Sequence, residues 1–166
     1  MIQQHTINTV YPVGPVHCYS GELGGELVLF DTGPPTSAAR DCLRANLDLS
    51  RLKHVVITHC HIDHYGLASW LEKETDATIY LPYRDILKIV RHDERFAKMS
   101  ELLLEIGFDQ SYIERFISSL HDGDILPPPP DSYRTVESDL PQHLGLDVVS
   151  CPGHSQSDLV VVGPDW

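Results

Sequence analysis

At 166 residues the chain has the length of a single domain and is long enough to bury a substantial core. Twelve basic and 24 acidic residues give a formal net charge of −12, which disfavours nucleic acid phosphates and anionic membrane surfaces as partners. No apolar run approaches the roughly 20 residues that a membrane-spanning helix needs, and the N-terminus lacks the pattern of a signal peptide. We therefore expect one domain over residues 1–166, located in the cytoplasm, with its four cysteines reduced and with no nucleic acid or membrane partner.

Short β-rich runs alternate with turn residues in the first third of the chain. They predict two or three antiparallel strands at residues 6–13, 16–20 and 26–33. A helix is expected next, over residues 34–48, with Thr36 or Ser37 as its N-cap. The compact β-branched run KHVVITH, residues 53–59, is typical of a strand that is buried on both faces.

The remainder alternates helical and extended patterns. Helices are expected at residues 66–75 and 84–106, with Gly107 as the stop of the second, and Ser111 with Glu114 resembles a capping box before a further helix. The four prolines at 127–130 indicate a stiff surface connection. Further strands are predicted at residues 78–82, 146–152 and 158–163. This order of elements predicts an α/β protein with layered sheets.

The stretch THCHIDHYG, residues 58–66, carries three histidines and one aspartate directly after the buried strand. His59 and His61 are two residues apart in backbone that is still extended, so their imidazoles can converge on one point. Asp63 and His64 follow where the chain turns into a helix, and they can aim at a neighbouring point. Neutral imidazole and carboxylate bind zinc, iron or manganese well, so we expect a metal site here.

This stretch resembles the THxHxDHxG signature of the metallo-β-lactamase superfamily. Two other segments agree in order and spacing with that family: residues 16–35, which end in a DTG turn containing Asp31, and CPGHS, which contains His154. The resemblance implies an αββα sandwich with a metal site at one edge between the sheets. The general form of the motif is similar to the thioesterase and glyoxalase II-like branches of the family.

Residue by residue, the resemblance assigns His59, His61 and His154 to a first metal and Asp63 and His64 to a second. It implies one or two zinc ions, with iron or manganese as alternatives. Asp63 would also act catalytically by orienting the attacking water and accepting its proton. Two interpretations of Asp31 stay open: it holds a ligand histidine or the loop in place, or it belongs only to a turn.

The family pattern continues beyond this sequence, with a bridging aspartate and a later histidine that have no counterpart here. Asp165 lies too close to the preceding strand to take the bridging role. We therefore expect a sandwich that is incomplete at its C-terminus and is the N-terminal part of a longer domain. An exposed strand edge could then pair with a second copy in a homodimer. We also expect at most one tightly held metal per chain, with weak or undetectable hydrolysis.

The leading functional hypothesis is a metal-dependent hydrolase in which metal-activated water attacks a small ester, thioester, lactone or lactam. One alternative is a mononuclear iron oxidoreductase similar to the persulfide dioxygenases, which share the histidine loop. Another is a catalytically inactive domain that binds one metal or none. The fold alone does not choose between these, because function depends on the groups around the metal.

Overall fold

Six strands form the main sheet of the computed structural model, which describes residues 1–9, 12–120 and 126–163. They lie in the order β1 (Gln3–Ile7), β2 (Val16–Leu23), β3 (Glu26–Phe30), β4 (Leu52–Val56), β5 (Thr78–Leu81) and β6 (Arg134–Thr135). The first three strands pair antiparallel, and the last four, β3 to β6, pair parallel. Strands β7 (Asp147–Ser150) and β8 (Leu159–Val162) form a separate antiparallel pair.

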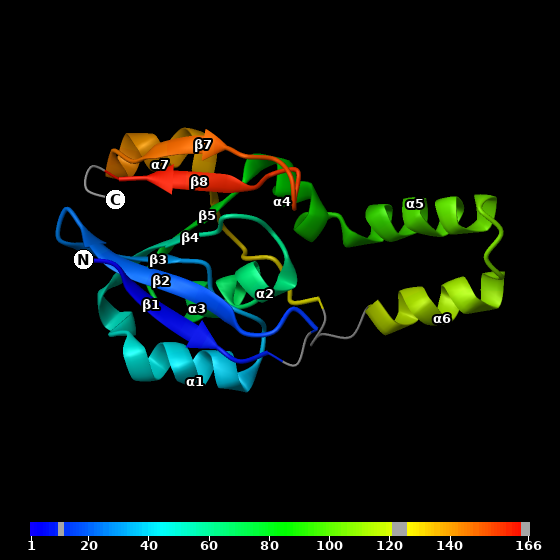
Figure 1. Ribbon diagram of the computed structural model, residues 1–166, viewed down its shortest axis with the longest axis horizontal. Coiled ribbons are helices and arrows are strands. Elements are labelled where there is room, and N and C mark those ends of the chain that lie inside the picture. Colours follow the sequence, from blue (N-terminus) through cyan, green and yellow to red (C-terminus); the bar gives the residue numbers. More distant parts are fainter. Residues whose placement is uncertain (10–11, 121–125, 164–166) are drawn as a thin grey trace.

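Both faces of the main sheet are covered (Figure 1). Helices α1 (Ser37–Asn46) and α3 (Ala68–Glu74) lie on one side of the main sheet. The β7–β8 pair and α7 (Val136–Leu144) lie on the other side. The remaining helices are η1 (Leu49–Arg51), α2 (Ile62–Tyr65), α4 (Tyr83–Val90), α5 (His92–Glu105) and α6 (Gln110–Leu120). This arrangement confirms the predicted αββα layering, with a second sheet of two strands among the described residues.

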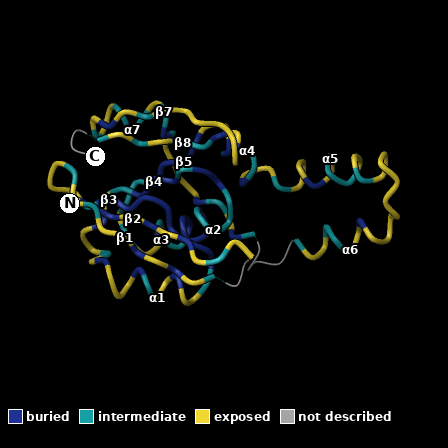
Figure 2. Tube along the Cα trace, viewed as in Figure 1, coloured by how far each residue is buried: buried dark blue, intermediate teal, exposed yellow. Residues whose placement is uncertain are grey.

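The alternation of side chains along the central strands builds one apolar core on each face of the main sheet. Val28 and Phe30 of β3 pack with β4, β5, α7 and β8 in one cluster, whereas Leu29 between them joins the cluster beneath α1 and α3. Val55 and Val56 of β4 divide between the two clusters in the same way. The central strands are dark blue in the burial tube of Figure 2. The prediction that residues 53–59 contain a strand buried on both faces is therefore confirmed.

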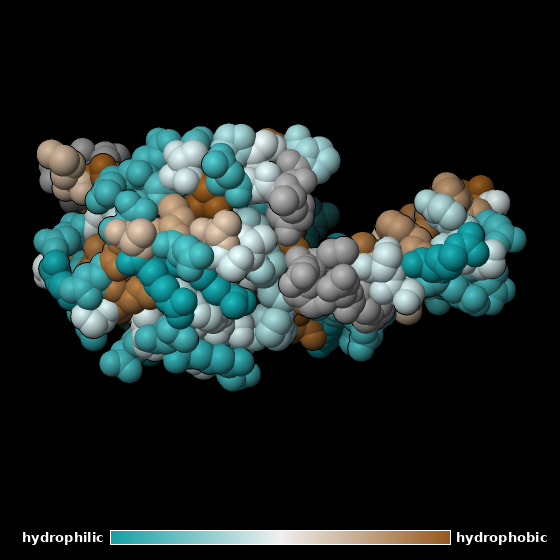
Figure 3. All heavy atoms as spheres, turned by 90° about the horizontal axis from the view of Figure 1, so that it is seen from below, coloured by the Kyte–Doolittle hydropathy of each residue, from teal (hydrophilic) through white to brown (hydrophobic). Residues whose placement is uncertain are grey.

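Helices α5 and α6 project from the body as a pair (Figures 1 and 2). The helical structure expected over residues 84–106, with Gly107 as its stop, is confirmed except at Arg91, which leaves helical geometry at φ −129° and ψ 47° and separates α4 from α5. The expected cap at Ser111 is wrong: the carboxylate of Asp109 accepts hydrogen bonds from the backbone amides that follow it. A space-filling view from below shows apolar side chains among polar ones along the projection (Figure 3).

Two further expectations need correction. The first strand occupies Gln3–Ile7 and not residues 6–13, of which residues 10 and 11 lie outside the described part. The short strand β6 and helix α7 were not predicted, because Pro141 inside α7 argues against a helix there. The helix tolerates Pro141 in its last turn and ends at Gly145, which adopts the left-handed conformation at φ 63°. Asp165 lies outside the described residues.

Candidate metal centre

Three parallel strands deliver their carboxyl ends to the same edge of the main sheet. Asp31 follows β3 directly, His59 follows β4, and Asp85 lies just after β5 in α4. Because neighbouring parallel strands run the same way, the segments that follow them lie together at that edge. The turn between β7 and β8 brings His154 to the same place from the second sheet.

His59, His61 and His154 converge there, although 93 residues separate the last two. One side-chain nitrogen from each ring lies within 4.8 Å of the corresponding nitrogens of the other two. His61 Nδ1 and His154 Nε2 lie 2.9 Å apart. His59 is buried, His61 is half-buried and His154 is exposed, so the cluster is open to solvent on one side. Three imidazoles with an open side are a donor set that suits a zinc ion.

The hydrogen bonds around His59 orient its ring toward the centre of this cluster. The Thr58 hydroxyl donates to Asp31 Oδ2 at 2.8 Å, so its oxygen can accept the Nδ1 proton of His59 at 3.2 Å. This leaves Nε2 of His59 as the nitrogen with a free lone pair. That atom is buried and has no hydrogen-bond partner among the described residues. A buried polar atom without a partner is costly, and a bound cation would remove that cost.

The pKa values of two ring groups favour the neutral, metal-binding form. Burial, reinforced by the nearby His64, lowers the pKa of His59 to about 4, although Asp31 acts in the opposite direction. Burial also lowers the pKa of His61, with further lowering from His154 and Lys88. Both imidazoles are therefore unprotonated at neutral pH, and a metal ion would not have to displace a proton from them.

Asp63 and His64 lie beside this cluster, in α2. The His64 ring centroid is 4.0 Å from that of His59. Its Nδ1 lies 2.8 Å from Asp31 Oδ2, so Nε2 faces the other way and lies 3.8 Å from Asp63 Oδ2. Burial opposes protonation of His64, but the hydrogen bond and charge of Asp31 outweigh it and raise the pKa of the ring. The structure thus places all five predicted ligand residues at one edge, and their roles stay predictions.

The Asp-Thr-Gly turn fixes α2 in place. Asp31 adopts the left-handed conformation, at φ 57°, which aspartate tolerates better than most side chains. Its carboxylate accepts the backbone amide of Thr58 at 2.8 Å in addition to the contacts described above. Thr32 binds the backbone carbonyl oxygen of His64 through both its amide, at 2.7 Å, and its hydroxyl, at 2.8 Å. Of the two interpretations of Asp31, the contacts match the one in which it holds a ligand histidine.

Two carboxylates near the cluster were missed from the sequence. Asp158 Oδ1 lies 3.8 Å from His59 Nδ1, and Asp85 binds the backbone between His59 and His61. Asp85 could have been noticed as an acidic residue three positions before Lys88 and four before the apolar Ile89, on the same face of the helix. Asp158 stands at the start of an apolar strand and gives no comparable signal.

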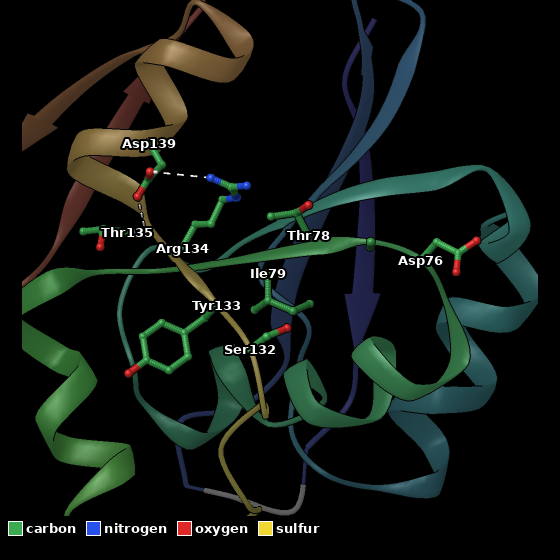
Figure 4. A pocket seen from close by; sticks show the side chains of 9 residues that line it. Asp76, Thr78, Ile79, Ser132, Tyr133, Arg134, Thr135 and Asp139 are labelled. Atoms are coloured by element: carbon green, nitrogen blue, oxygen red, sulfur yellow. Dashed lines mark hydrogen bonds and ion pairs between the residues drawn. The ribbon is translucent and has the colours of Figure 1, made fainter.

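A hollow of about 670 Å³ lies away from this cluster, beside the start of β5 and beside β6 (Figure 4). Its wall includes Tyr133 and Arg134, and the Arg134 guanidinium lies 3.9 Å from the Asp139 carboxylate. None of the five predicted ligand residues lines it. The chemistry of the histidine cluster therefore belongs to the open edge of the sandwich and not to this hollow.

Comparison with known proteins agrees with this geometry. Residues 11–165 match the family model of the metallo-beta-lactamase superfamily. The chain belongs to this superfamily. Membership accounts for the αββα layers and the histidine loop, and the three converging histidines are a group that could hold a metal ion.

Individual relatives are about twice as long as this chain. "Probable metallo-hydrolase YqjP" of Bacillus subtilis (strain 168) is 29% identical over 172 residues, which cover 93% of this chain and 51% of that protein. The metallo-beta-lactamase family protein TTHA1429 of Thermus thermophilus is 25% identical with a TM-score of 0.72, over 96% of this chain and 55% of its own.

A beta-lactamase domain protein from Burkholderia ambifaria, 19% identical with a TM-score of 0.65, shares the fold over 96% of this chain and 48% of its own. The chain thus spans about half the length of these relatives. Within the described part of the chain, no helix combines the length and apolarity needed to cross a membrane.

Proposed function

We propose that this chain carries the metal-binding half of a metal-dependent hydrolase that acts on small esters, thioesters, lactones or lactams. The observation that carries the proposal is the buried Nε2 of His59, which has no hydrogen-bond partner among the described residues and belongs to the cluster formed with His61 and His154. Zinc is the proposed metal, because a set of three imidazoles with an open side suits it. A zinc ion held there would supply Lewis acidity and lower the pKa of water toward neutrality.

The residues around the cluster have separate proposed roles: proton transfer, ligand binding and orientation of the histidines. Asp63 is half-buried beside His64 and is proposed to orient the attacking water and to accept its proton. His64 keeps Nε2 on the side away from Asp31, where it could bind a second ion or a polar group of the substrate. Asp31 keeps two histidines in the required orientation. It holds His64 directly, and it holds His59 through the hydroxyl of Thr58.

The open side of the cluster supports a small, uncharged or weakly charged substrate. His154 is exposed, so a ligand can reach the site from that side, whereas His59 closes it from beneath. The formal charge of −12 disfavours polyanionic substrates such as nucleic acids. The likeness of the histidine loop to the glyoxalase II-like branch supports thioesters as the first substrates to test.

Metal analysis combined with a substrate panel tests the proposal. We expect one tightly held zinc per chain and slow hydrolysis of a thioester, ester, lactone or lactam that disappears when a chelator removes the zinc. Hydrolysis should be slow because Asp63 and His64 alone provide few ligands for a second ion. Tightly bound iron with oxidation of glutathione persulfide, and no zinc-dependent hydrolysis, would contradict the proposal in favour of an oxidoreductase.

A further inference from the structure

Asp85 of α4 has no exposed surface and binds both loops that carry the histidines. Its Oδ2 accepts a hydrogen bond from the backbone amide of Cys60 at 2.8 Å. The same oxygen accepts the hydroxyl of Ser155 at 3.1 Å, and Oδ1 forms an ion pair with Lys88 one turn later in the helix. One buried carboxylate thus receives a backbone donor, a hydroxyl donor and a cation.

The two donors stand next to the proposed metal ligands. Cys60 separates His59 from His61, and Ser155 follows His154. Lys88 extends the contact, because its Nζ donates to the Ser155 hydroxyl oxygen at 2.8 Å while that hydroxyl donates to Asp85.

The loop after β7 is stiff as well as anchored. The amide of Cys151 donates to the carbonyl oxygen of Asp158 at 2.8 Å, and the amide of Ser155 donates to the Asp158 carboxylate at 2.7 Å. A fixed Ser155 therefore fixes its neighbour His154.

Stability alone is a poor explanation for this arrangement. Burying the Asp85 carboxylate removes its hydration, and apolar residues of similar size are often at least as stabilising as a buried ion pair. Burial opposes ionisation of Asp85, but the hydrogen bonds from Lys88, Ser157 and the Cys60 amide outweigh it and hold the pKa of the carboxyl below its usual value. The carboxylate is therefore charged at neutral pH and accepts from all its donors.

We propose that Asp85, supported by Lys88, is a positioning residue for the metal centre: it clamps the histidine loop after β4 to the histidine loop after β7. This inference rests on the proposed function only in so far as the three histidines bind a metal. It does not depend on hydrolysis. The clamp holds the ligand nitrogens near one another before the metal arrives, so that binding does not have to order two separate loops.

The substitution Asp85→Asn tests the clamp with little change in shape. An asparagine side chain offers one acceptor oxygen in place of two, and its amide group places a donor against the Lys88, Cys60 or Ser155 donors. We expect the zinc affinity, measured by competition with a chromophoric chelator, to fall by roughly 10- to 100-fold. Hydrogen exchange of the Cys60 amide in the metal-free chain should become faster, because its acceptor is weakened.

Two further variants keep the test independent of folding defects. Ser155→Ala removes only the link to the second loop, and it should weaken zinc binding while Cys60 stays protected. Asp139→Asn is the matched control, because the Asp139 carboxylate also accepts a backbone amide, from Thr135 at 2.7 Å, and faces an arginine. It binds neither histidine loop, so it should leave the zinc affinity unchanged.

A double variant separates positioning from general destabilisation. If Asp85 acts through the placement of His154, the fold-loss that Asp85→Asn causes should shrink to less than about threefold when His154→Ala is already present. Equal zinc affinity in Asp85→Asn, Ser155→Ala and the parent chain would overturn the clamp, as would a full loss in the double variant. Zinc binding without hydrolysis would contradict the proposed function and leave the clamp standing. A parent chain that binds no zinc would overturn both.

Discussion

Gly66, the last residue of the histidine motif, should be intolerant of even one added methyl group. A Cβ atom built there would lie 2.5 Å from the carbonyl oxygen of Ile62 and 2.6 Å from both N and Cδ of Pro35. Ordinary contacts between such atoms are about 3.5–4.0 Å, so the backbone on one side would have to move by about 1 Å. The partners are backbone atoms and a proline ring, which cannot swing away as a flexible side chain could.

The magnitude of the effect of Gly66→Ala follows from two opposing terms. Gly66 has helical geometry, at φ −54° and ψ −28°, so alanine itself is favoured by up to about 1 kcal/mol. Overpacking costs about 1–3 kcal/mol, and the rigid neighbours place this site at the upper end. We expect a net loss of about 2 kcal/mol in the free energy of unfolding. For a chain of this length that corresponds to a melting temperature lower by about 4–8 °C.

The assay is thermal unfolding of the metal-free chain followed by circular dichroism, with Gly153→Ala as the matched control. Gly153 also lies beside a predicted ligand, but an added Cβ there would meet nothing within 4 Å, and its φ is not in the left-handed range. Its free energy of unfolding should change by less than about 0.5 kcal/mol. If Gly66→Ala has the same melting temperature as Gly153→Ala, the packing argument is refuted. The zinc affinity of Gly66→Ala should also fall, because His61 is the N-cap of α2 and moving the helix displaces this proposed ligand.

Three other outcomes follow from the site. His61→Ala should remove most of the bound metal in elemental analysis while the circular dichroism spectrum stays unchanged, because the core comes from the strands; a spectrum typical of an unfolded chain would contradict this. Asp63→Ala should keep the tightly held zinc but abolish thioester hydrolysis, and full turnover would exclude the proposed proton acceptor. The metal-free chain should also lose stability as the pH falls from 6.5 toward 4. In this range His59 is protonated in the unfolded chain but stays neutral in the folded chain, where its pKa is lowered to about 4. His64, whose pKa is raised, contributes in the opposite sense and only as the pH rises above 6.5. A His59→Gln variant should therefore make the acid side less steep without flattening it, because the pKa of His61 is lowered as well.

The parts of the fold that sequence patterns predicted are those in which one local signal dominates. The β-branched run before His59 indicated a buried strand, and the capping threonine Thr36, whose hydroxyl accepts the Ala39 amide at 3.2 Å, indicated the start of α1. The misplaced parts depend on competing signals. Arg91 interrupts a continuous helical pattern without glycine or proline, and Pro141 lies inside a helix whose Val136 and Leu140 are fixed by packing against the main sheet.

Some residues of the candidate site were likewise predictable from a local signal, and others were not. The spacing of His59, His61, Asp63 and His64 is local, so the sequence alone could place them together. His154 joined them only through the family resemblance, because no local rule connects residues 93 positions apart. Asp85 could not be assigned to the site, because its contacts with Cys60 and Ser155 come from three segments that meet only in the folded chain.

The cluster is asymmetric, and the asymmetry has a chemical consequence. His59 is buried beneath the site and is oriented through Thr58 by Asp31, whereas His154 is exposed and its loop is joined to Asp85 through Ser155. The Asp31–Thr58 contact therefore sets which nitrogen of His59 points at the cluster. The Asp85–Ser155 contact sets how closely the loop that carries His154 approaches the loop that carries His59 and His61. The side of His154 is open to solvent, whereas the opposite side is filled by the core. A loss of the Asp85 clamp should accordingly loosen His154, the residue nearest to solvent, first, and His59, the residue nearest to the core, last.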